Sequence, residues 1–363
     1  MTAGASGILE LPPACVDLAG RVDRELERFV AAQRAALDRV DARVDPLLAE
    51  IQRVIEAGGK RLRPLFCCLG HMAAGAEVGE EAIRAASALE LLHTFAIVHD
   101  DVMDRSASRR GVPATWVHLA EEHRSERFVG DSGAYGIAAA VLAGDMSLVL
   151  ADRALLEAGF PIERLVPALS RYDRMRVEVV AGQYLDVRAA HRGSADEAEA
   201  RRIAVLKSGG YTVEAPLEIG AILGAAADPI RGALSGYGVR LGEAFQLRDD
   251  VLGTFGDPAV TGKDRDSDLR EGKRTVMLAK AAAAADHAGR AFLRDRVGRP
   301  DLTDAEIERA RSLIAETGAL DDVVALIRQL VDEAKAEIAG SEIPSEAARL
   351  LDEMAEVVAV RRL

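Results

Sequence analysis

Glu90-Leu-Leu-His-Thr-Phe-Ala-Ile-Val-His-Asp-Asp-Val-Met-Asp104 is an apolar run that ends in three carboxylates. At 100° per residue, His93, Asp100 and Asp104 fall within about 40° of one another on a helix. The two carboxylates then stand about 5–6 Å apart and repel each other unless a cation lies beside them. Mg²⁺ suits this arrangement because it takes few protein carboxylates and completes its shell with water and phosphate oxygens. The run predicts a helix with a magnesium site at its end; a solvated acidic helix end is the alternative.

A second acidic pair ends another apolar helical run far downstream, in the segment 245–250 with the sequence FQLRDD. Two such helices facing each other could hold several magnesium ions around one diphosphate. Cations placed in this way help to draw a highly charged leaving group off carbon. One acidic helix is common, but two in this context indicate a polyphosphate site.

Basic clusters accompany the acidic helices. In the segment 58–64, GGKRLRP, the glycines permit close backbone approach, Lys60 offers a point charge and Arg63 offers a planar fork for phosphate oxygens. A second cluster, Arg109-Arg110-Gly111, follows the first acidic helix, and Lys207, Lys263 and Lys273 add further cations. The combined pattern predicts a site for two polyphosphates, one bound through metal and one through Arg and Lys.

The composition predicts an all-α fold in a cytoplasmic protein. Apolar residues make up 49% of the 363 residues and aromatic residues only 4%; Ala and Leu, strong helix formers, are prominent. The net charge of −13 argues against nucleic acid as a partner. Three cysteines without metal-binding spacing fit a reducing compartment. The longest apolar stretch, Ala134–Ala151, contains Asp145 and two glycines, so we expect a buried helix and no integral membrane segment.

We expect a single helical domain over residues 21–363. Residues 1–20 contain Pro12, Pro13 and several glycines without clear periodicity, which predicts a loosely ordered leader. The remainder shows no alternating strand of useful length and no internal repeat of about 20–50 residues.

From about residue 45 onward the sequence resembles the trans-isoprenyl diphosphate synthases, or polyprenyl synthetases. The family's motifs occur in order: GGKRLRP at 58–64, HDDVMD at 99–104, RRG at 109–111, GD at 144–145, GQYLD at 182–186, KS at 207–208, FQLRDD at 245–250, TGK at 261–263 and EGKRT at 271–275. The resemblance implies antiparallel helices around a deep central cavity and, usually, a homodimer.

The resemblance also implies roles for individual residues. The positions that match contacts to isopentenyl diphosphate are Lys60, Arg63, His93 and Arg110, and those that match magnesium ligands are Asp100, Asp104 and Asp249. The positions that match the allylic diphosphate site are Arg109, Gln183, Asp186, Lys207, Ser208, Gln246, Lys263 and Lys273. The expected catalytic set is Asp100, Asp104, Asp249, Lys207 and Gln246.

In the implied reaction, magnesium and basic side chains ionise the allylic diphosphate, and the double bond of isopentenyl diphosphate attacks the carbocation. A proton is then lost to the released diphosphate. The second acidic motif reads DDVLG, so Gly253 stands where many relatives have a third aspartate; we expect weakened support around Asp249 with retained activity. The TGK segment continues into an unusually charged stretch, which leaves the role of Asp268 open.

In this family the residues just before the first aspartate motif largely set the product length. Small Ala96 lies one turn before Asp100, and bulky Phe95 precedes it. This combination resembles bacterial geranylgeranyl diphosphate synthases, which make a twenty-carbon product; a farnesyl or a longer-chain synthase is the alternative. An ideal helix places Phe95 off the Asp100 stripe, so its role as the floor of the product pocket rests on the resemblance alone.

Two other functions compete with this interpretation. A class I terpene synthase would lack GGKRLRP and would carry an Asn/Ser/Glu metal triad in place of FQLRDD. A non-catalytic partner subunit of another synthase would usually lose aspartates from one of the two motifs, whereas this chain keeps both.

Overall fold

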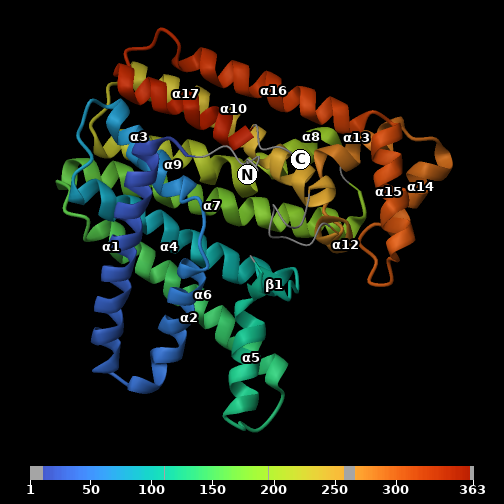
Figure 1. The fold of residues 1–363 in the computed structure, drawn as a ribbon, viewed down its shortest axis with the longest axis horizontal. Helices are drawn as coiled ribbons and strands as arrows, with labels where there is room; N and C mark the ends of the chain where they lie inside the picture. The colour runs from blue at the N-terminus through green and yellow to red at the C-terminus, as the bar shows by residue number, and fades with distance from the viewer. Residues whose placement is uncertain (1–10, 110, 195, 257–265, 360–363) are drawn as a thin grey trace, which may run out of the picture. The chain divides into compact units, whose positions relative to one another are not determined.

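The computed structural model describes residues 11–109, 111–194, 196–256 and 266–359. Helices make up most of this part of the chain, which confirms the expected all-α class (Figure 1). The only strands within it are β1 (Ser108–Arg109) and β2 (Val112–Pro113), which pair antiparallel as a short hairpin. The chain separates into two compact units.

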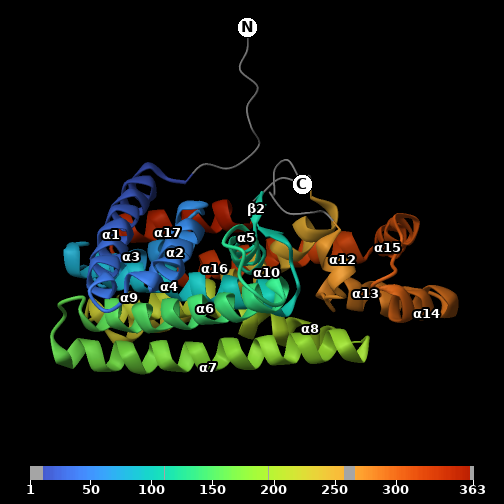
Figure 2. The same ribbon diagram turned by 90° about the horizontal axis from the view of Figure 1, so that it is seen from below.

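The amino-terminal unit comprises Pro13–Cys68 and Glu77–Leu165. Its helices are α1 (Pro13–Asp38), the 3₁₀ turn η1 (Ala42–Val44), α2 (Asp45–Glu56), the first part of α3 (Leu62–Ala73), α4 (Glu80–Met103), α5 (Thr115–Ser125) and α6 (Ser132–Leu156). Helix α6 packs against both α4 and α5, and its contact with α5 is visible in Figure 2. Val98, Leu119, Ala139 and Ala140 are buried together where the three helices meet.

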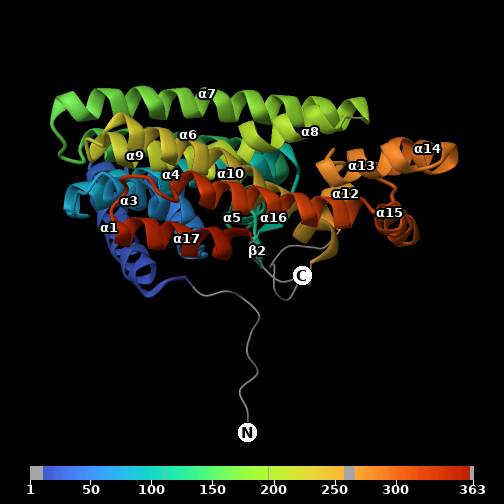
Figure 3. The same cartoon turned by 90° about the horizontal axis from the view of Figure 1, so that it is seen from above.

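The carboxy-terminal unit contains Leu69–Ala76 and the chain from Val166 onward. Its elements are α7 (Ile162–Arg192), α8 (Glu197–Ala204), the π-helical segment η2 (Val205–Glu214), α9 (Ala215–Leu223), α10 (Asp228–Phe255), α12 (Ser267–Glu271), α13 (Val276–Ala284), α14 (His287–Arg296), α15 (Asp304–Glu316), α16 (Ala319–Ile338) and α17 (Ser345–Ala359). Helix α10 packs against η2, α16 and α17, and the last two helices lie beside each other in Figure 3.

The start of the first helix corrects one expectation. Helix α1 begins at Pro13, so residues 13–20, which we expected to be loosely ordered, are helical. Proline is favourable in the first turn of a helix, where no backbone N–H is needed, and Cys15 and Leu18 are buried. Residues 1–10 of the expected leader lie outside the described residues. The single domain over 21–363 stays a prediction.

Helix α6 contains the apolar stretch Ala134–Ala151 and is only partly buried. Among the described residues it is the one helix long and apolar enough to cross a membrane, and 44% of its most apolar window is buried. One face packs on α4 and α5, while Ile137, Val141, Leu142, Val149 and Leu156 are exposed. The expectation of a buried helix therefore holds for one face of α6 and is wrong for the other.

Candidate active site

Helix α4 places the first pair of carboxylates at its carboxyl end. The helix starts after Gly79 with Glu80 and Glu81 in its first turn, where acidic side chains interact favourably with the helix dipole and stabilise the helix. Asp104 is the last, capping residue, and its backbone N–H donates to the carbonyl of Asp100 at 2.8 Å. The two aspartates are thus one helical turn apart, as the sequence predicts.

Arg109 is held against this end of α4. Its guanidinium donates to Asp101 Oδ1 at 2.7 Å and lies 3.5 Å from Asp100 Oδ2. Asp101 is buried, whereas the Asp100 side chain is 23% exposed. The hairpin of β1 and β2 carries Arg109 and turns at Gly111, which has φ +76°. Sequence reasoning gave Asp101 no role; the structure shows that it anchors Arg109 beside the first aspartate motif.

Residues 58–61 of the GGKRLRP segment lie in the turn between α2 and α3, residues 62–64 begin α3, and a buried arginine fixes the path of the turn. Gly58 has φ +86° and Arg61 φ +51°, a conformation that is uncommon for a residue with a side chain. Arg61 is 6% exposed and donates to Asp23, Glu90 and the Ile55 carbonyl, each at 2.7 Å. It therefore holds the turn between the two expected phosphate-binding residues, Lys60 and Arg63. Sequence reasoning missed it because a buried and a solvated arginine look the same in sequence.

Phe95 lies on the side of α4 that faces α6. Its ring meets the His99 ring edge to face, with centroids 4.7 Å apart. His99 Nε2 lies 3.1 Å from the Val141 carbonyl and 3.7 Å from Asp145 Oδ1. A side chain at Gly144 would overlap the His99 ring, so the GD motif provides the close approach of the two helices. Phe95 and Ala96 are both partly buried.

In the carboxy-terminal unit, Lys207 and Asp186 form an ion pair. Lys207 Nζ lies 2.6 Å from Asp186 Oδ2, and the two side chains are 19% and 16% exposed. Lys207 and Ser208 belong to η2, whose π-helical hydrogen bonding is rare and recurs at functional sites. Gly182 of α7 has no room for a Cβ because the backbone of Leu206 and Lys207 passes over it. The glycine of the GQYLD motif thereby brings α7, which carries Asp186, close to the backbone of the lysine.

Helix α10 carries Gln246, Asp249 and Asp250. Gln246 Nε2 donates to Asp250 Oδ1 at 2.7 Å. Burial, together with the nearby charge of Asp268, raises the pKa of the Asp250 carboxyl well above its usual range. Asp249 is more exposed than Asp250. This difference leaves Asp249 as the more accessible of the two carboxylates, and its role as a metal ligand stays a prediction.

Asp268 fills the space beside Gly253. A Cβ built on Gly253 would overlap the Asp268 carboxylate, which is 6% exposed and accepts a hydrogen bond from Lys273 Nζ at 3.1 Å. The missing third aspartate of the DDVLG motif is thus matched by a carboxylate from α12, one turn along α10 from Asp249. Sequence spacing could not place Asp268 there because it lies in a different element.

The carboxylates suit a divalent cation by their chemistry. Asp100 and Asp104 are one turn apart and partly exposed, and Asp249 is accessible on α10. Within the described ranges, no three carboxylate, imidazole or thiolate groups stand close enough to enclose an ion by themselves. Mg²⁺ fits such sparse donors because it keeps several waters and takes its other ligands from substrate phosphates.

Comparison with known proteins agrees with the motifs. The sequence profile of the polyprenyl synthetase family matches residues 45–314. The chain belongs to the polyprenyl synthetase family. Members of this family that it resembles are prenyltransferases, and the enzyme class and isoprenoid-synthase fold expected from the sequence are confirmed.

Three relatives of this polyprenyl synthetase show the range of the family. Geranylfarnesyl diphosphate synthase of Aeropyrum pernix is 34% identical over 82% of this chain and 89% of its own. The (2E,6E)-farnesyl diphosphate synthase of Mycobacterium bovis is 33% identical over 93% and 91%. Geranylgeranyl pyrophosphate synthase of Corynebacterium glutamicum, solved with isoprenyl diphosphate and magnesium, is 35% identical with a TM-score of 0.91, over 95% of this chain and 99% of that one.

The expected site residues divide between the two units. The amino-terminal unit holds Lys60, Arg63, His93, Phe95, Ala96, Asp100, Asp104 and Arg109, and the carboxy-terminal unit holds Gln183, Asp186, Lys207, Ser208, Gln246, Asp249 and Lys273. Arg110 and Lys263 lie outside the described residues. Their roles, and those of the other site residues, stay predictions.

Proposed function

We propose that this polyprenyl synthetase condenses isopentenyl diphosphate with allylic diphosphates head to tail, and that geranylgeranyl diphosphate is its main product. The observation that carries the proposal is the end of α4, where Asp100 and Asp104 stand one turn apart beside Arg109. Carboxylates can bind a metal ion here, and the guanidinium of Arg109 is fixed beside them. Together, the metal ion and the guanidinium would neutralise the negative charge of a departing diphosphate.

Each group of side chains has a task in this reaction. Asp100, Asp104 and Asp249 would hold Mg²⁺, which when bound supplies positive charge for the departing allylic diphosphate. Lys60, Arg63 and His93 bind the diphosphate of the second substrate, and Lys207 and Gln246 contact the allylic one. The allylic C–O bond breaks, the double bond of isopentenyl diphosphate supplies the electron pair of the new C–C bond, and a proton leaves to the released diphosphate.

The proposed product length rests on Phe95 and Ala96. Phe95 is backed by the His99 ring, which is itself fixed against α6, so the bulky side chain has a rigid support. Small Ala96, on the Asp100 side of the helix, leaves room for a growing chain. The relatives named above span fifteen-, twenty- and twenty-five-carbon products, so the twenty-carbon product is part of the proposal.

We propose that the enzyme is a cytoplasmic homodimer. The exposed apolar face of α6, with Leu142 56% and Val149 64% exposed, suits a second copy of the chain better than water. A second subunit that covers this face would explain why a long apolar helix is exposed in the single chain.

The cysteines are compatible with the proposed cytoplasmic location. Cys67 and Cys68 are buried, and burial raises the pKa of the Cys68 thiol to about 12, which makes this thiol unreactive.

Incorporation of isopentenyl diphosphate into allylic products by wild-type protein and by Asp100→Asn tests the proposal. Removing one metal ligand and its charge should reduce kcat by at least about 100-fold, with the helix content unchanged in circular dichroism. Glu81→Gln, at the exposed amino end of the same helix, is the matched control and should retain activity. Full activity of Asp100→Asn would contradict the metal assignment; an inactive wild type would favour the partner-subunit function.

A further inference from the structure

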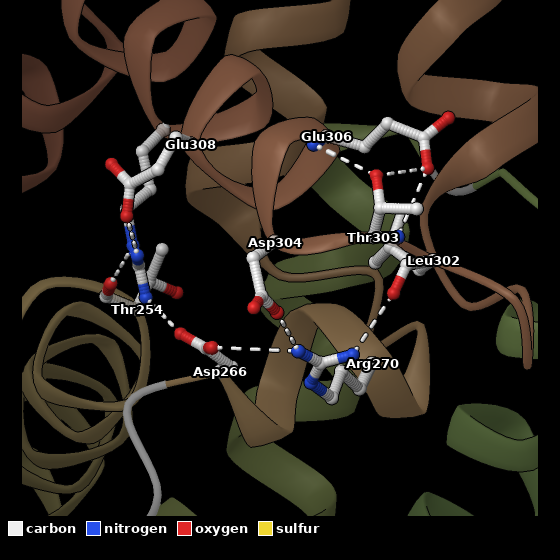
Figure 4. Close-up of polar contacts among 9 residues, drawn as sticks. Thr254, Asp266, Arg270, Leu302, Thr303, Asp304, Glu306 and Glu308 are labelled. Carbon is white, nitrogen blue, oxygen red and sulfur yellow. Dashed lines mark hydrogen bonds and ion pairs between the residues drawn. The ribbon is translucent and has the colours of Figure 1, made fainter.

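A buried arginine of α15 ties α10, which carries the second aspartate motif, to the start of α12, which carries Asp268. Arg311 is 6% exposed. Its Nε donates to the Thr254 carbonyl at 2.8 Å, and its two terminal nitrogens donate to Asp266 and Glu308, each at 2.5 Å (Figure 4). One planar side chain thus reaches three acceptors in three directions.

Two of these acceptors belong to different elements. Thr254 lies in the last turn of α10, five residues after Asp249, and Asp266 immediately precedes α12. Arg311 therefore fixes the start of α12 to the end of α10. A lysine could keep the charge but could not span the same acceptors, because its donors share a single nitrogen.

A second arginine completes the attachment of α12. Arg270 donates to the Leu302 carbonyl at 2.9 Å and to Asp304 at 2.6 Å, and it lies 3.7 Å from Asp266 (Figure 4). The Leu302 carbonyl and Asp304 lie at the start of α15, which a capping box stabilises. The Thr303 N–H donates to the Glu306 carboxylate at 3.0 Å, and the Glu306 N–H donates to the Thr303 hydroxyl. Helix α12 is only five residues long, so external attachments of this kind decide its position.

The position of α12 decides where one carboxylate stands. Asp268 is in its first turn, and its carboxylate fills the space of a side chain at Gly253. Gly253 is one turn from Asp249 on the same helix, and Lys273 binds Asp268 from the other end of α12. A shift of α12 along α10 would move Asp268 and Lys273 together, away from Asp249.

We propose that Arg311 is a positioning residue of the second aspartate motif: by tying α12 to α10 it holds Asp268 beside Gly253 and so sets the affinity of this motif for a magnesium-bound diphosphate. The inference rests on the proposed function, in which Asp249 binds that group. Arg311 itself acts through Asp266 and α12 and touches no substrate.

Calorimetric titration with inorganic diphosphate in excess Mg²⁺ tests this role without turnover. Arg311→Lys should weaken binding at least about tenfold and raise KM for the allylic substrate more than it lowers kcat. Arg309→Lys is the matched control on the same helix; its guanidinium stacks over Phe292 at 4.3 Å and reaches neither α10 nor α12 in the described contacts, so wild-type affinity is expected. If Arg311→Lys does not fold, Asp266→Asn removes the same link and should show the same loss.

A double variant decides whether Arg311 acts through Asp268. Asp268→Asn should weaken binding, and adding Arg311→Lys to it should cause no further loss. Wild-type affinity in Arg311→Lys, fully additive losses, or a wild type that does not bind magnesium-bound diphosphate would each overturn the proposal. If the wild type binds diphosphate but makes no prenyl product, the proposed reaction fails while the titration still measures the role of Arg311.

Discussion

At the scale of single residues, the site depends on charged side chains that are buried and contact other protein groups. Arg61 holds the turn between Lys60 and Arg63, and Asp101 holds Arg109. Losing one member of a buried pair leaves the other charge without compensation, typically at a cost of about 3–5 kcal/mol. Such residues make the geometry of the proposed phosphate-binding groups a property of the fold.

Phe95 carries the prediction on product length. Phe95→Ala should shift the products of the enzyme toward longer chains, because the bulky ring that His99 supports would no longer close the space beside Ala96. Chromatography of the dephosphorylated alcohols measures the shift. Phe95→Tyr, which keeps the aromatic ring, should not lengthen the products. An unchanged distribution in Phe95→Ala would remove Phe95 as the floor.

The sequence predicted candidate site residues but not the buried side chains that support them. The roles of the basic clusters, inferred from their charges and from the resemblance, stay predictions. That Asp100 and Asp104 lie one turn apart at the end of a helix could be predicted, because helix periodicity fixes which side chains share a face. Arg61 and Arg311 could not, since burial depends on contacts with segments far away in the chain. Asp268 could not be placed beside Gly253 because it lies in a different helix, and periodicity does not predict how two helices pack against each other.

At the scale of elements, the close packing of η2 on α10 positions Lys207. Gly209 of η2 and Gly242 of α10 face each other, and a Cβ on either would overlap the backbone of the other. The sequence predicted helical segments here, and it did not predict the π-helical hydrogen bonding of η2. The position of the KS motif therefore depends on Gly209 and Gly242, which lie outside the motif.

Gly242→Ala tests this contact. The added methyl group should force η2 away from α10 and lower the free energy of unfolding by about 1–3 kcal/mol, with a loss of activity through displaced Lys207. Gly232→Ala is the matched control in the same helix, since nothing lies within 4 Å of an added Cβ there. It should raise stability by about 0.5–1 kcal/mol, because alanine favours a helix over glycine. Urea unfolding of both variants measures the difference, and equal stabilities would contradict the packing argument.

At the scale of the whole molecule, the all-helical class followed from composition and motif order, and it is confirmed. The exposed face of α6 could not be predicted from the sequence. An apolar helix has the same sequence pattern whether another helix of its own chain or a second subunit covers it. The exposed residues Ile137, Val141, Leu142 and Val149 lie on the helix that also contacts His99. A homodimer would thus form directly behind the support of Phe95.

Light scattering after size-exclusion chromatography tests the dimer. Wild-type protein should have about twice the 38.7 kDa mass of one chain. Leu142→Glu should shift the protein toward monomer, because it places a charge in the apolar face. Val40→Glu changes a residue that is 78% exposed beyond the end of α1 and should leave the mass unchanged. A monomeric wild type would overturn the proposed assembly.

The most direct test of the account is product analysis of the wild-type enzyme. Purified protein is supplied with isopentenyl diphosphate, Mg²⁺ and, in separate reactions, allylic primers of five, ten and fifteen carbons, and the dephosphorylated alcohols are separated by chromatography. The account predicts a dominant twenty-carbon alcohol that requires both substrates and Mg²⁺. The absence of any prenyl alcohol with all three primers would contradict it.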